Sequence, residues 1–190
     1  MSDPALAYEE KWTYADYRKW ELKPGERYEL LDGVAYAMSA PSTEHQLIAS
    51  LINSEFFNYL KGKKCKVIPA PFDVRLFYEE DESDDTVVQP DLVVVCDHAK
   101  LGKEGCQGAP DLVIEILSPS NTAIEMHRKL NLYQSAGVRE YWVIDPDEKI
   151  AEVYRLVGDR YETRILRISD TLQSAIFPDF AIPMETIFAI

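Results

Sequence analysis

The chain has 190 residues, of which 46% are hydrophobic and 28% charged, and its formal net charge is −13. This length and composition favour one compact domain over residues 1–190 and argue against extensive disorder. No apolar run approaches the roughly 18 residues that a membrane-spanning helix needs, and the first residues lack the basic flank and apolar stretch of a secretion signal. We therefore expect a cytoplasmic protein that does not contact a membrane.

The acidic charge opposes long-range attraction to nucleic acid, whose phosphates are also negative. Six of the 33 acidic residues lie in segment 79–86, and such a run of like charges is typical of a solvated loop. Removing those six from the net charge still leaves −7. The lysines of 61–66 could touch phosphate, but lysines are also typical of a helix C-terminus.

The cysteines are Cys65, Cys96 and Cys106, an odd number without a CxxC pair. A disulfide framework normally uses an even number of cysteines, and zinc sites usually contain closely spaced pairs. The pattern therefore predicts reduced thiols with a structural role.

The N-terminal third is expected to contain two helices and a hairpin. The first helix is predicted over 13–22, with a threonine at its start and Pro24–Gly25 after its end. The pair Asp32–Gly33 lies between two strand-like runs, which is a strong signal for a β-hairpin. A longer helix is predicted after residues 41–43, because apolar residues then recur every three or four positions until Gly62.

Later segments predict a sheet with one more helix. Nearly continuous apolar runs, typical of strands in the middle of a sheet, occupy 66–78, 91–97 and 111–117. A helix is predicted over 122–136, and its expected buried stripe is Met126, Leu130 and Tyr133. An antiparallel meander is predicted from 139–145, 150–156 and 161–168. The apolar tail 177–188 is expected to pack on this body.

Glu115 is a carboxylate in the middle of a predicted strand. Because side chains alternate between the two faces of a strand, it shares a face with Val113 and Leu117. The opposite face carries Leu112, Ile114 and Ile116. A buried unpaired charge costs several kcal/mol as an order of magnitude, so a glutamate here should be paired, protonated or bound to a metal. A salt-bridged or edge-exposed glutamate is the alternative.

Asp91 begins the preceding strand and shares its face with Val93 and Val95. Acids on neighbouring strands can converge, and two carboxylates with water are ligands that Mg²⁺ or Mn²⁺ prefers. Asp91 could instead be a turn residue after proline. Asp111 shares the face of Glu115 and is a weaker candidate, because it also follows a proline at the start of a strand.

Several phrases occur in a specific order: GERYELLDG, a helix opened by Glu44 and His45, QPDLVVV, APDLVIEILSPSN and RKLNLYQSAGVREYWVIDP. Together they resemble the Uma-two family of putative restriction endonucleases, in the PD-(D/E)XK nuclease superfamily, over about residues 25–182. The resemblance implies an α/β (α+β) restriction-endonuclease-like core, a mixed curved β-sheet flanked by helices, with an N-terminal helix and hairpin. It also implies hydrolysis of nucleic acid, with DNA expected, using Mg²⁺ or Mn²⁺ held by Asp91 and Glu115.

The sequence departs from the superfamily where Leu117 replaces the lysine expected two residues after the glutamate. Lys129 is the candidate substitute, because it flanks the buried stripe of the third helix and relatives carry a lysine on this helix. By the same resemblance, Glu29 is a weaker candidate for an accessory ligand and His45 for a phosphate or water contact. The alternatives are that Lys129 is solvated, that Glu29 is an exposed strand residue, and that His45 is a capping or core histidine.

Two further functions stay open. Leu117 and the acidic surface also fit a nuclease fold that has lost catalysis and acts as a metal- or protein-binding module. A structural homodimer could form through strands 139–145 and 150–156. Metal-dependent cleavage of nucleic acid would separate an active nuclease from the first alternative, and sedimentation would report assembly. No Ser-His-Asp order, Walker loop or GxGxxG is present, so the sequence does not indicate a triad hydrolase, nucleotide-driven motor or dinucleotide enzyme.

Overall fold

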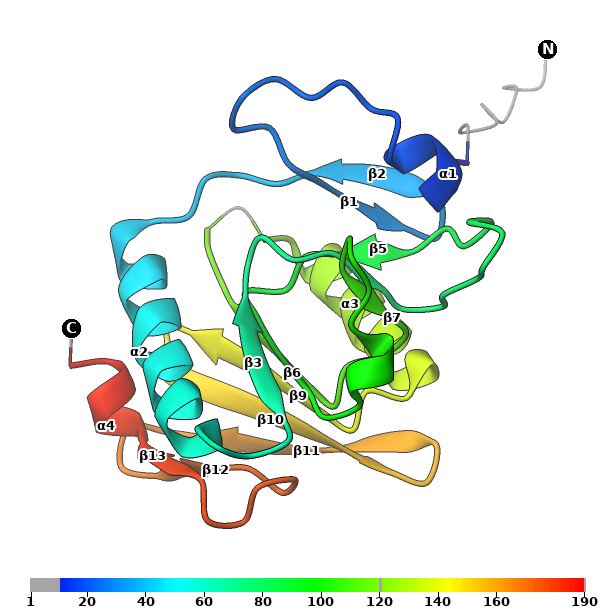
Figure 1. Ribbon diagram of the computed structural model, residues 1–190. Coiled ribbons are helices and arrows are strands. Elements are labelled where there is room, and N and C mark those ends of the chain that lie inside the picture. The colour runs from blue at the N-terminus through cyan, green and yellow to red at the C-terminus, as the bar shows by residue number, and fades with distance from the viewer. Residues whose placement is uncertain (1–10, 120, 190) are drawn as a thin grey trace, which may run out of the picture.

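A six-stranded mixed sheet forms the centre of the computed structural model, which describes residues 11–119 and 121–189 (Figure 1). Strands β8 and β9 are parallel, and the other neighbours in this sheet are antiparallel. In spatial order the strands are β11 (Arg160–Leu166), β10 (Ile150–Val157), β9 (Glu140–Asp145), β8 (Leu112–Ile116), β6 (Leu92–Val95) and β3 (Lys66–Pro69). The expected α/β class and the mixed sheet are confirmed.

A second sheet lies beside the first and carries the predicted hairpin. Its order is β2 (Val34–Ala37), β1 (Tyr28–Leu31), β5 (Val87–Val88), β4 (Val74–Arg75) and β7 (Cys106–Gln107). The turn between β1 and β2 has positive φ angles at Asp32 (51°) and Gly33 (80°). Two such residues form a tight turn whose twist matches that of the strands, so the predicted hairpin is confirmed.

Two long helices cover opposite faces of the central sheet, α2 (Thr43–Leu60) and α3 (Ala123–Ala136) (Figure 1). The side chain of Ser42 accepts a hydrogen bond from the His45 backbone N–H at 3.1 Å and so caps α2. Thr122 caps α3 in the same way, and Gly137 ends it with φ of 84°. Both predicted helices are confirmed.

The two faces of β8 enter different cores. Leu112, Ile114 and Ile116 pack toward α2, whereas Val113 packs toward α3. The buried stripe of α3 differs from the expected one, because it consists of Lys129, Leu132 and Tyr133. Met126 and Leu130 are only partly buried at the side of this stripe. The helix is therefore rotated so that a lysine faces the sheet.

Two predicted elements are shorter than expected. Helix α1 covers only Tyr14–Tyr17, because the following residues turn back so that Trp20 packs against the Tyr17 ring at 5.2 Å. The predicted strand 66–78 is interrupted after Pro69, so that β3 and β4 belong to different sheets. Pro69 and Pro71 lack the backbone N–H that a continuous strand in a ladder requires.

The prediction of three reduced thiols is wrong, because Cys65 and Cys96 form a disulfide. The register of β3 with β6 pairs Lys66 with Val95, and the next positions outward are the two cysteines. Cys106 is free and buried. Sequence spacing did not reveal the pair, since 31 residues separate the partners and only strand pairing makes them neighbours.

The acidic segment 79–86 is only partly the solvated loop that was expected. Glu79, Glu80 and Asp81 are exposed, but Asp84 is 5% exposed and forms an ion pair with Arg75. The Arg75 Nε donates to Asp84 Oδ2 at 2.9 Å. A buried carboxylate is stable only with such a partner, so the run is not simply a set of repelling surface charges.

The C-terminal part forms the predicted meander and packed tail. The tail comprises β12 (Thr171–Gln173), β13 (Ala181–Pro183) and α4 (Met184–Ile187), and Phe180 of this tail stacks on Phe56 of α2. Strands β9 and β10 have neighbours on both sides, so neither offers a free edge for the hypothetical homodimer. A short 3₁₀ helix spans His98–Lys100. Among the described residues no helix is both long and apolar enough to cross a membrane.

Candidate active site

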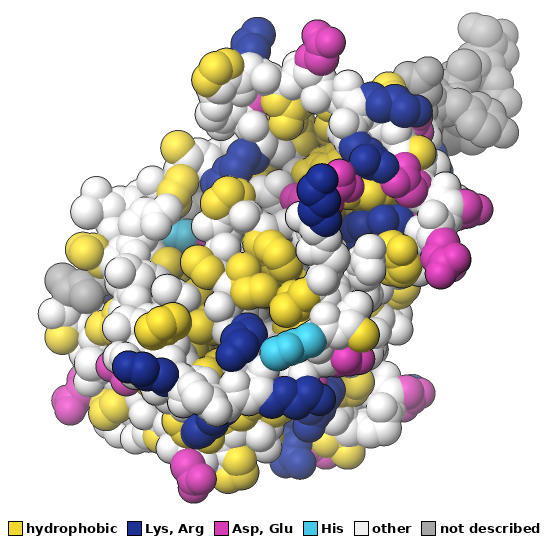
Figure 2. Space-filling model, viewed as in Figure 1, with side chains coloured by type: hydrophobic (Ala, Val, Ile, Leu, Met, Phe, Trp, Pro, Cys, Tyr) yellow, Lys and Arg dark blue, Asp and Glu magenta, His cyan; other side chains and the backbone are white. Residues whose placement is uncertain are grey.

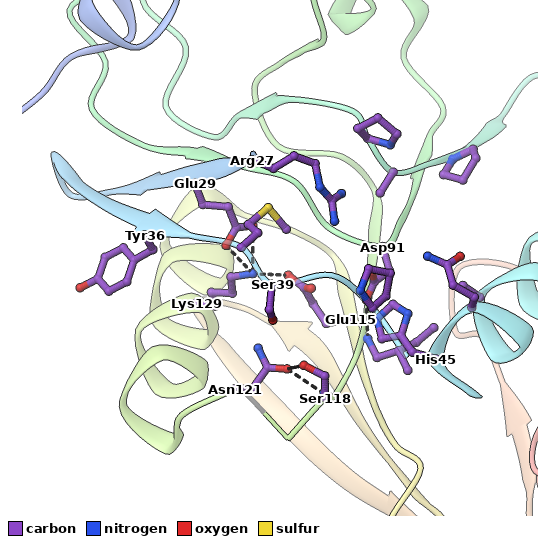
Figure 3. A pocket seen from close by; sticks show the side chains of 18 of the residues that line it. Arg27, Glu29, Tyr36, Ser39, His45, Asp91, Glu115, Ser118, Asn121 and Lys129 are labelled. Atoms are coloured by element: carbon purple, nitrogen blue, oxygen red, sulfur yellow. Dashed lines mark hydrogen bonds and ion pairs between the residues drawn. The ribbon is translucent and has the colours of Figure 1, made fainter. Parts of the chain in front are cut away.

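A cavity of about 480 Å³ lies where β6 begins, β8 ends and α2 starts, beside the β1–β2 hairpin and α3 (Figure 3). The five residues proposed from the sequence all line it: Glu29, His45, Asp91, Glu115 and Lys129. They come from five different elements or their ends, so the fold brings together groups that are far apart in the chain. This cavity is the candidate active site.

Asp91 and Glu115 lie across from each other on neighbouring strands. The antiparallel register pairs Leu92 with Ile114, and continuing it by one residue sets Asp91 opposite Glu115. The Asp91 Oδ2 accepts a hydrogen bond from the Ile116 backbone N–H at 2.7 Å, and it lies 3.1 Å from His45 Nε2. These contacts fix the Asp91 carboxylate at the wall of the cavity.

The Lys129 ammonium lies between two carboxylates. Its Nζ is 2.8 Å from Glu29 Oε2 and 3.0 Å from Glu115 Oε1. Tyr133, one helical turn further along α3, donates its hydroxyl to the same Glu115 oxygen at 2.8 Å. Lys129 is only 3% exposed, and its side chain reaches back from the helix to the sheet (Figure 3). Glu29 and Lys129 are thus held by each other and not solvated.

Burial and charge shift the titration of these groups. Burial raises the pKa of Glu115 to about 7; the Lys129 ammonium opposes this rise, and the Glu29 and Asp91 carboxylates add to it. Burial alone would lower the pKa of Lys129, but the Glu115 and Glu29 carboxylates hold it above its ordinary value. Burial and the nearby Glu115 charge raise the pKa of Tyr133 far above its ordinary value. Lys129 therefore stays charged and Tyr133 stays a hydrogen-bond donor.

His45 faces the site from the first turn of α2. Burial lowers the pKa of His45, but its hydrogen bond to Asp91 and the Asp91 and Glu115 charges outweigh this and raise it overall. Its Nδ1 is buried and has no hydrogen-bond partner among the described residues. The ring is thus oriented through Nε2 alone, toward the carboxylate of Asp91.

The donor set fits a hard divalent cation that keeps water ligands. The described residues contain no cluster of three or more His, Cys, Asp or Glu side chains arranged around one ion position. Asp91 Oδ1 and Glu115 Oε2 have no hydrogen-bond partner within the described chain, so one oxygen of each carboxylate is available. One or two carboxylates with water and substrate phosphate are usual for Mg²⁺, and the residues present meet that requirement.

Two other sequence candidates lie outside the cavity. Asp111 accepts from the Cys96 backbone N–H at 2.8 Å and from Arg139 at 3.0 Å, so it anchors the start of β8. Lys61, Lys63 and Lys64 are exposed at the end of α2. Figure 2 shows that, on the face of the molecule it presents, basic side chains gather where the end of α2 and β3 lie in Figure 1. This gathering lies away from the start of α2, where the cavity is.

Sequence reasoning missed several groups that line the cavity or contact its lining residues. Arg27 points into it (Figure 3), and it precedes Glu29 by two residues, so strand alternation could have indicated it. Tyr133 was assigned only to the core, although it lies four residues after Lys129. On α2 the polar residues Gln46, Ser50 and Asn53 also line the cavity. These residues follow one another at intervals of four and three, which places them on one side of the helix and could have indicated a shared polar surface.

Comparison with known proteins gives three concordant matches. The Uma2 family model, described as "Putative restriction endonuclease", matches residues 14–185. An uncharacterized protein of Synechocystis sp., slr1290, is 30% identical over 150 residues, which cover 78% of this chain and 76% of that protein. A crystal structure of a "putative nuclease belonging to DUF820" from Anabaena variabilis has a TM-score of 0.75 and 21% identity. The match covers 94% of this chain and 98% of that one.

The family match spans most of the chain, and the structural match shows that the fold is that of the Anabaena variabilis protein. The resemblance noted from the ordered sequence phrases is therefore confirmed. The chain belongs to the Uma2 family of putative restriction endonucleases, within a nuclease fold.

Proposed function

We propose that this protein is a metal-dependent nuclease that hydrolyses phosphodiester bonds of nucleic acid, using Mg²⁺ or Mn²⁺. One observation carries the proposal: Asp91, Glu115 and a buried Lys129 ammonium meet in one cavity although they come from three separate elements. Membership of the Uma2 family supports the same reaction class. The excess of carboxylates over cations in the cavity favours a bound divalent cation, which would reverse the local charge that phosphate meets.

In the proposed mechanism Asp91 and Glu115 would hold the cation through their available oxygens. When bound there, the cation would supply Lewis-acid polarisation of the scissile phosphate and would lower the pKa of the attacking water. His45 keeps Asp91 in place through its 3.1 Å contact. Lys129 orients the water or stabilises negative charge that develops on the phosphoryl oxygens. Glu29 and Tyr133 hold the Lys129–Glu115 pair in position.

Lys129 also bears on the alternative of a nuclease fold without catalysis. That alternative is motivated by Leu117, which leaves the motif without its lysine. The Lys129 Nζ, 3.0 Å from Glu115 Oε1, offers a cation next to the motif glutamate from another element. We therefore favour an active enzyme over a metal- or protein-binding module.

The test is a nuclease assay on single-stranded and duplex DNA and on RNA, with Mg²⁺, with Mn²⁺ and with EDTA. Cleavage that requires a divalent cation and is lost in Asp91→Ala is the expected result. Asp147→Ala is a matched control, because this aspartate is exposed and lines no part of the cavity, and it should retain cleavage. Absence of cleavage on all substrates in both metals, with the protein folded, would favour the module instead.

A further inference from the structure

The cavity has a second end that the proposed hydrolysis does not use. It continues along α2 past His45, where Gln46, Ser50 and Asn53 line it. Asn53 lies eight positions after His45, which corresponds to about 12 Å along a helix axis. Residues 69–71, at and just after the end of β3, also line the cavity. The whole cavity, at about 480 Å³, lies within the roughly 300–1,000 Å³ of typical small-molecule sites.

At this second end a buried polar atom has no hydrogen-bond partner among the residues that the structure describes. The Asn53 Oδ1 is buried and has no hydrogen-bond partner among the described residues, although Asn53 itself is only half-buried. A buried acceptor without a donor is unfavourable, so its presence beside a cavity points to a ligand that donates. Side-chain amides of this kind pair with the edges of nucleobases, to which they can donate and from which they can accept.

The reacting groups are too deeply placed to meet an unaltered duplex. Lys129 is 3% and Glu115 8% exposed, so the reacting phosphate has to enter the cavity. A duplex is stiff, and the Watson–Crick edges of its bases are occupied by pairing. A single strand, or a nucleotide extruded from a helix, can bend into a pocket and present its base edge.

Arg27 supplies a further contact that suits a strand entering the cavity. Its guanidinium points into the cavity (Figure 3), and no ion pair joins it to a carboxylate within the described residues. Arginine binds phosphate through paired N–H groups. The cavity thus offers a cationic contact for phosphate near its reacting end and amides at its far end.

We propose that the end of the cavity lined by Gln46, Ser50 and Asn53 binds the base of an unpaired nucleotide next to the scissile phosphate. The substrate class is then single-stranded or extruded nucleic acid, not continuous duplex. This inference rests on the proposed function for the identity of the reacting phosphate. The base-binding end itself can be tested without hydrolysis.

The test measures binding by fluorescence anisotropy, with Ca²⁺ replacing Mg²⁺, to a labelled mixed-sequence DNA strand. The same probe is also presented as duplex, as RNA and as an abasic strand. The protein should bind the single strand with an affinity at least about tenfold higher than its affinity for the duplex. Asn53→Leu should weaken binding of the base-bearing strand about tenfold, and leave the abasic strand unaffected.

Asn58→Leu is the matched control, since it makes the same change on an exposed position of α2. If Asn53→Leu does not fold, Gln46→Met at an exposed position replaces it, with the same expected loss. Equal binding by Asn53→Leu and Asn58→Leu, or equal binding of duplex and single strand, would overturn the inference. Base-dependent binding without cleavage in Mg²⁺ or Mn²⁺ would instead contradict the proposed function and leave the base-binding end standing.

Discussion

Replacing Lys129 by methionine removes the cation that lies between two buried carboxylates. The side chains of Lys129, Glu29 and Glu115 are at most 10% exposed, and both ion-pair distances are 3.0 Å or less. Methionine keeps most of the apolar stem but leaves the carboxylates facing each other. Breaking a buried ion pair costs about 3–5 kcal/mol. A loss of about 3 kcal/mol lowers the Tm by roughly 6–12 °C for a domain of this size.

The assay is thermal unfolding at mildly alkaline pH, first in EDTA and then with Mn²⁺. Because Mn²⁺ supplies the missing positive charge, it should raise the Tm of Lys129→Met more than that of the unchanged protein. Cleavage should fall about 100-fold or more. Lys103→Met, at an exposed lysine, should change none of these quantities. An unaltered Tm for Lys129→Met in EDTA would show that the buried Glu29–Lys129–Glu115 ion pairs do not stabilise the fold.

Three further predictions concern the body of the protein. Burial raises the pKa of Asp73 above its ordinary value, so the ionised carboxylate destabilises the folded state at neutral pH, and this destabilisation disappears below the pKa of the unfolded chain. Asp73→Asn should therefore raise the Tm at neutral pH and should not raise it near about pH 3. An equal change in Tm at both pH values would contradict this prediction. Gly137→Ala should cost about 1–2 kcal/mol of unfolding free energy, because its φ is 84° with open space around it. Gly105→Ala should cost clearly more in the same denaturant titration, since its Cβ would lie 2.3 Å from the Asp73 carbonyl oxygen; equal losses would show that this backbone yields easily. Thiol titration of the unfolded, unreduced chain should find one reactive cysteine, Cys106, whereas three would exclude the disulfide.

The turns, helix ends and strand faces that depend on residues close together in the sequence could be predicted. The turn at Asp32–Gly33 needs two positive φ angles, and this residue pair tolerates them. Helix α3 begins at a threonine cap and ends at a left-handed glycine, and both signals are contained within a few residues. The alternation in β8 likewise follows from strand geometry alone. Each of these features depends on neighbours in the sequence.

The errors arose where distant segments determine the outcome. Cys65 and Cys96 become neighbours only through the register of β3 with β6. The rotation of α3, which buries Lys129 in place of Met126, depends on a partner, Glu29, that is 100 residues away. An isolated helix offers no reason to bury a lysine, so the apolar stripe predicted from its sequence was shifted. Such pairings are set by tertiary packing.

The candidate site was predictable in its residues more than in its arrangement. Asp91, Glu115 and Lys129 could be named from strand position and from the resemblance to the family. The ion pairs that join Lys129 to two glutamates, and the hydrogen bond from Tyr133, could not, because they require the register of both sheets and the rotation of α3. The second end of the cavity on α2 was missed because its polar residues had no role in the expected chemistry.

Asp91 and Glu115 together should bind a divalent cation. The decisive experiment is calorimetric titration of the folded protein with Mn²⁺, with Glu115→Gln as the variant and the exposed Glu148→Gln as the control. Saturable binding by the unchanged protein and the control, abolished in Glu115→Gln, is the expected result. The same binding isotherm for Glu115→Gln as for the unchanged protein would contradict the account.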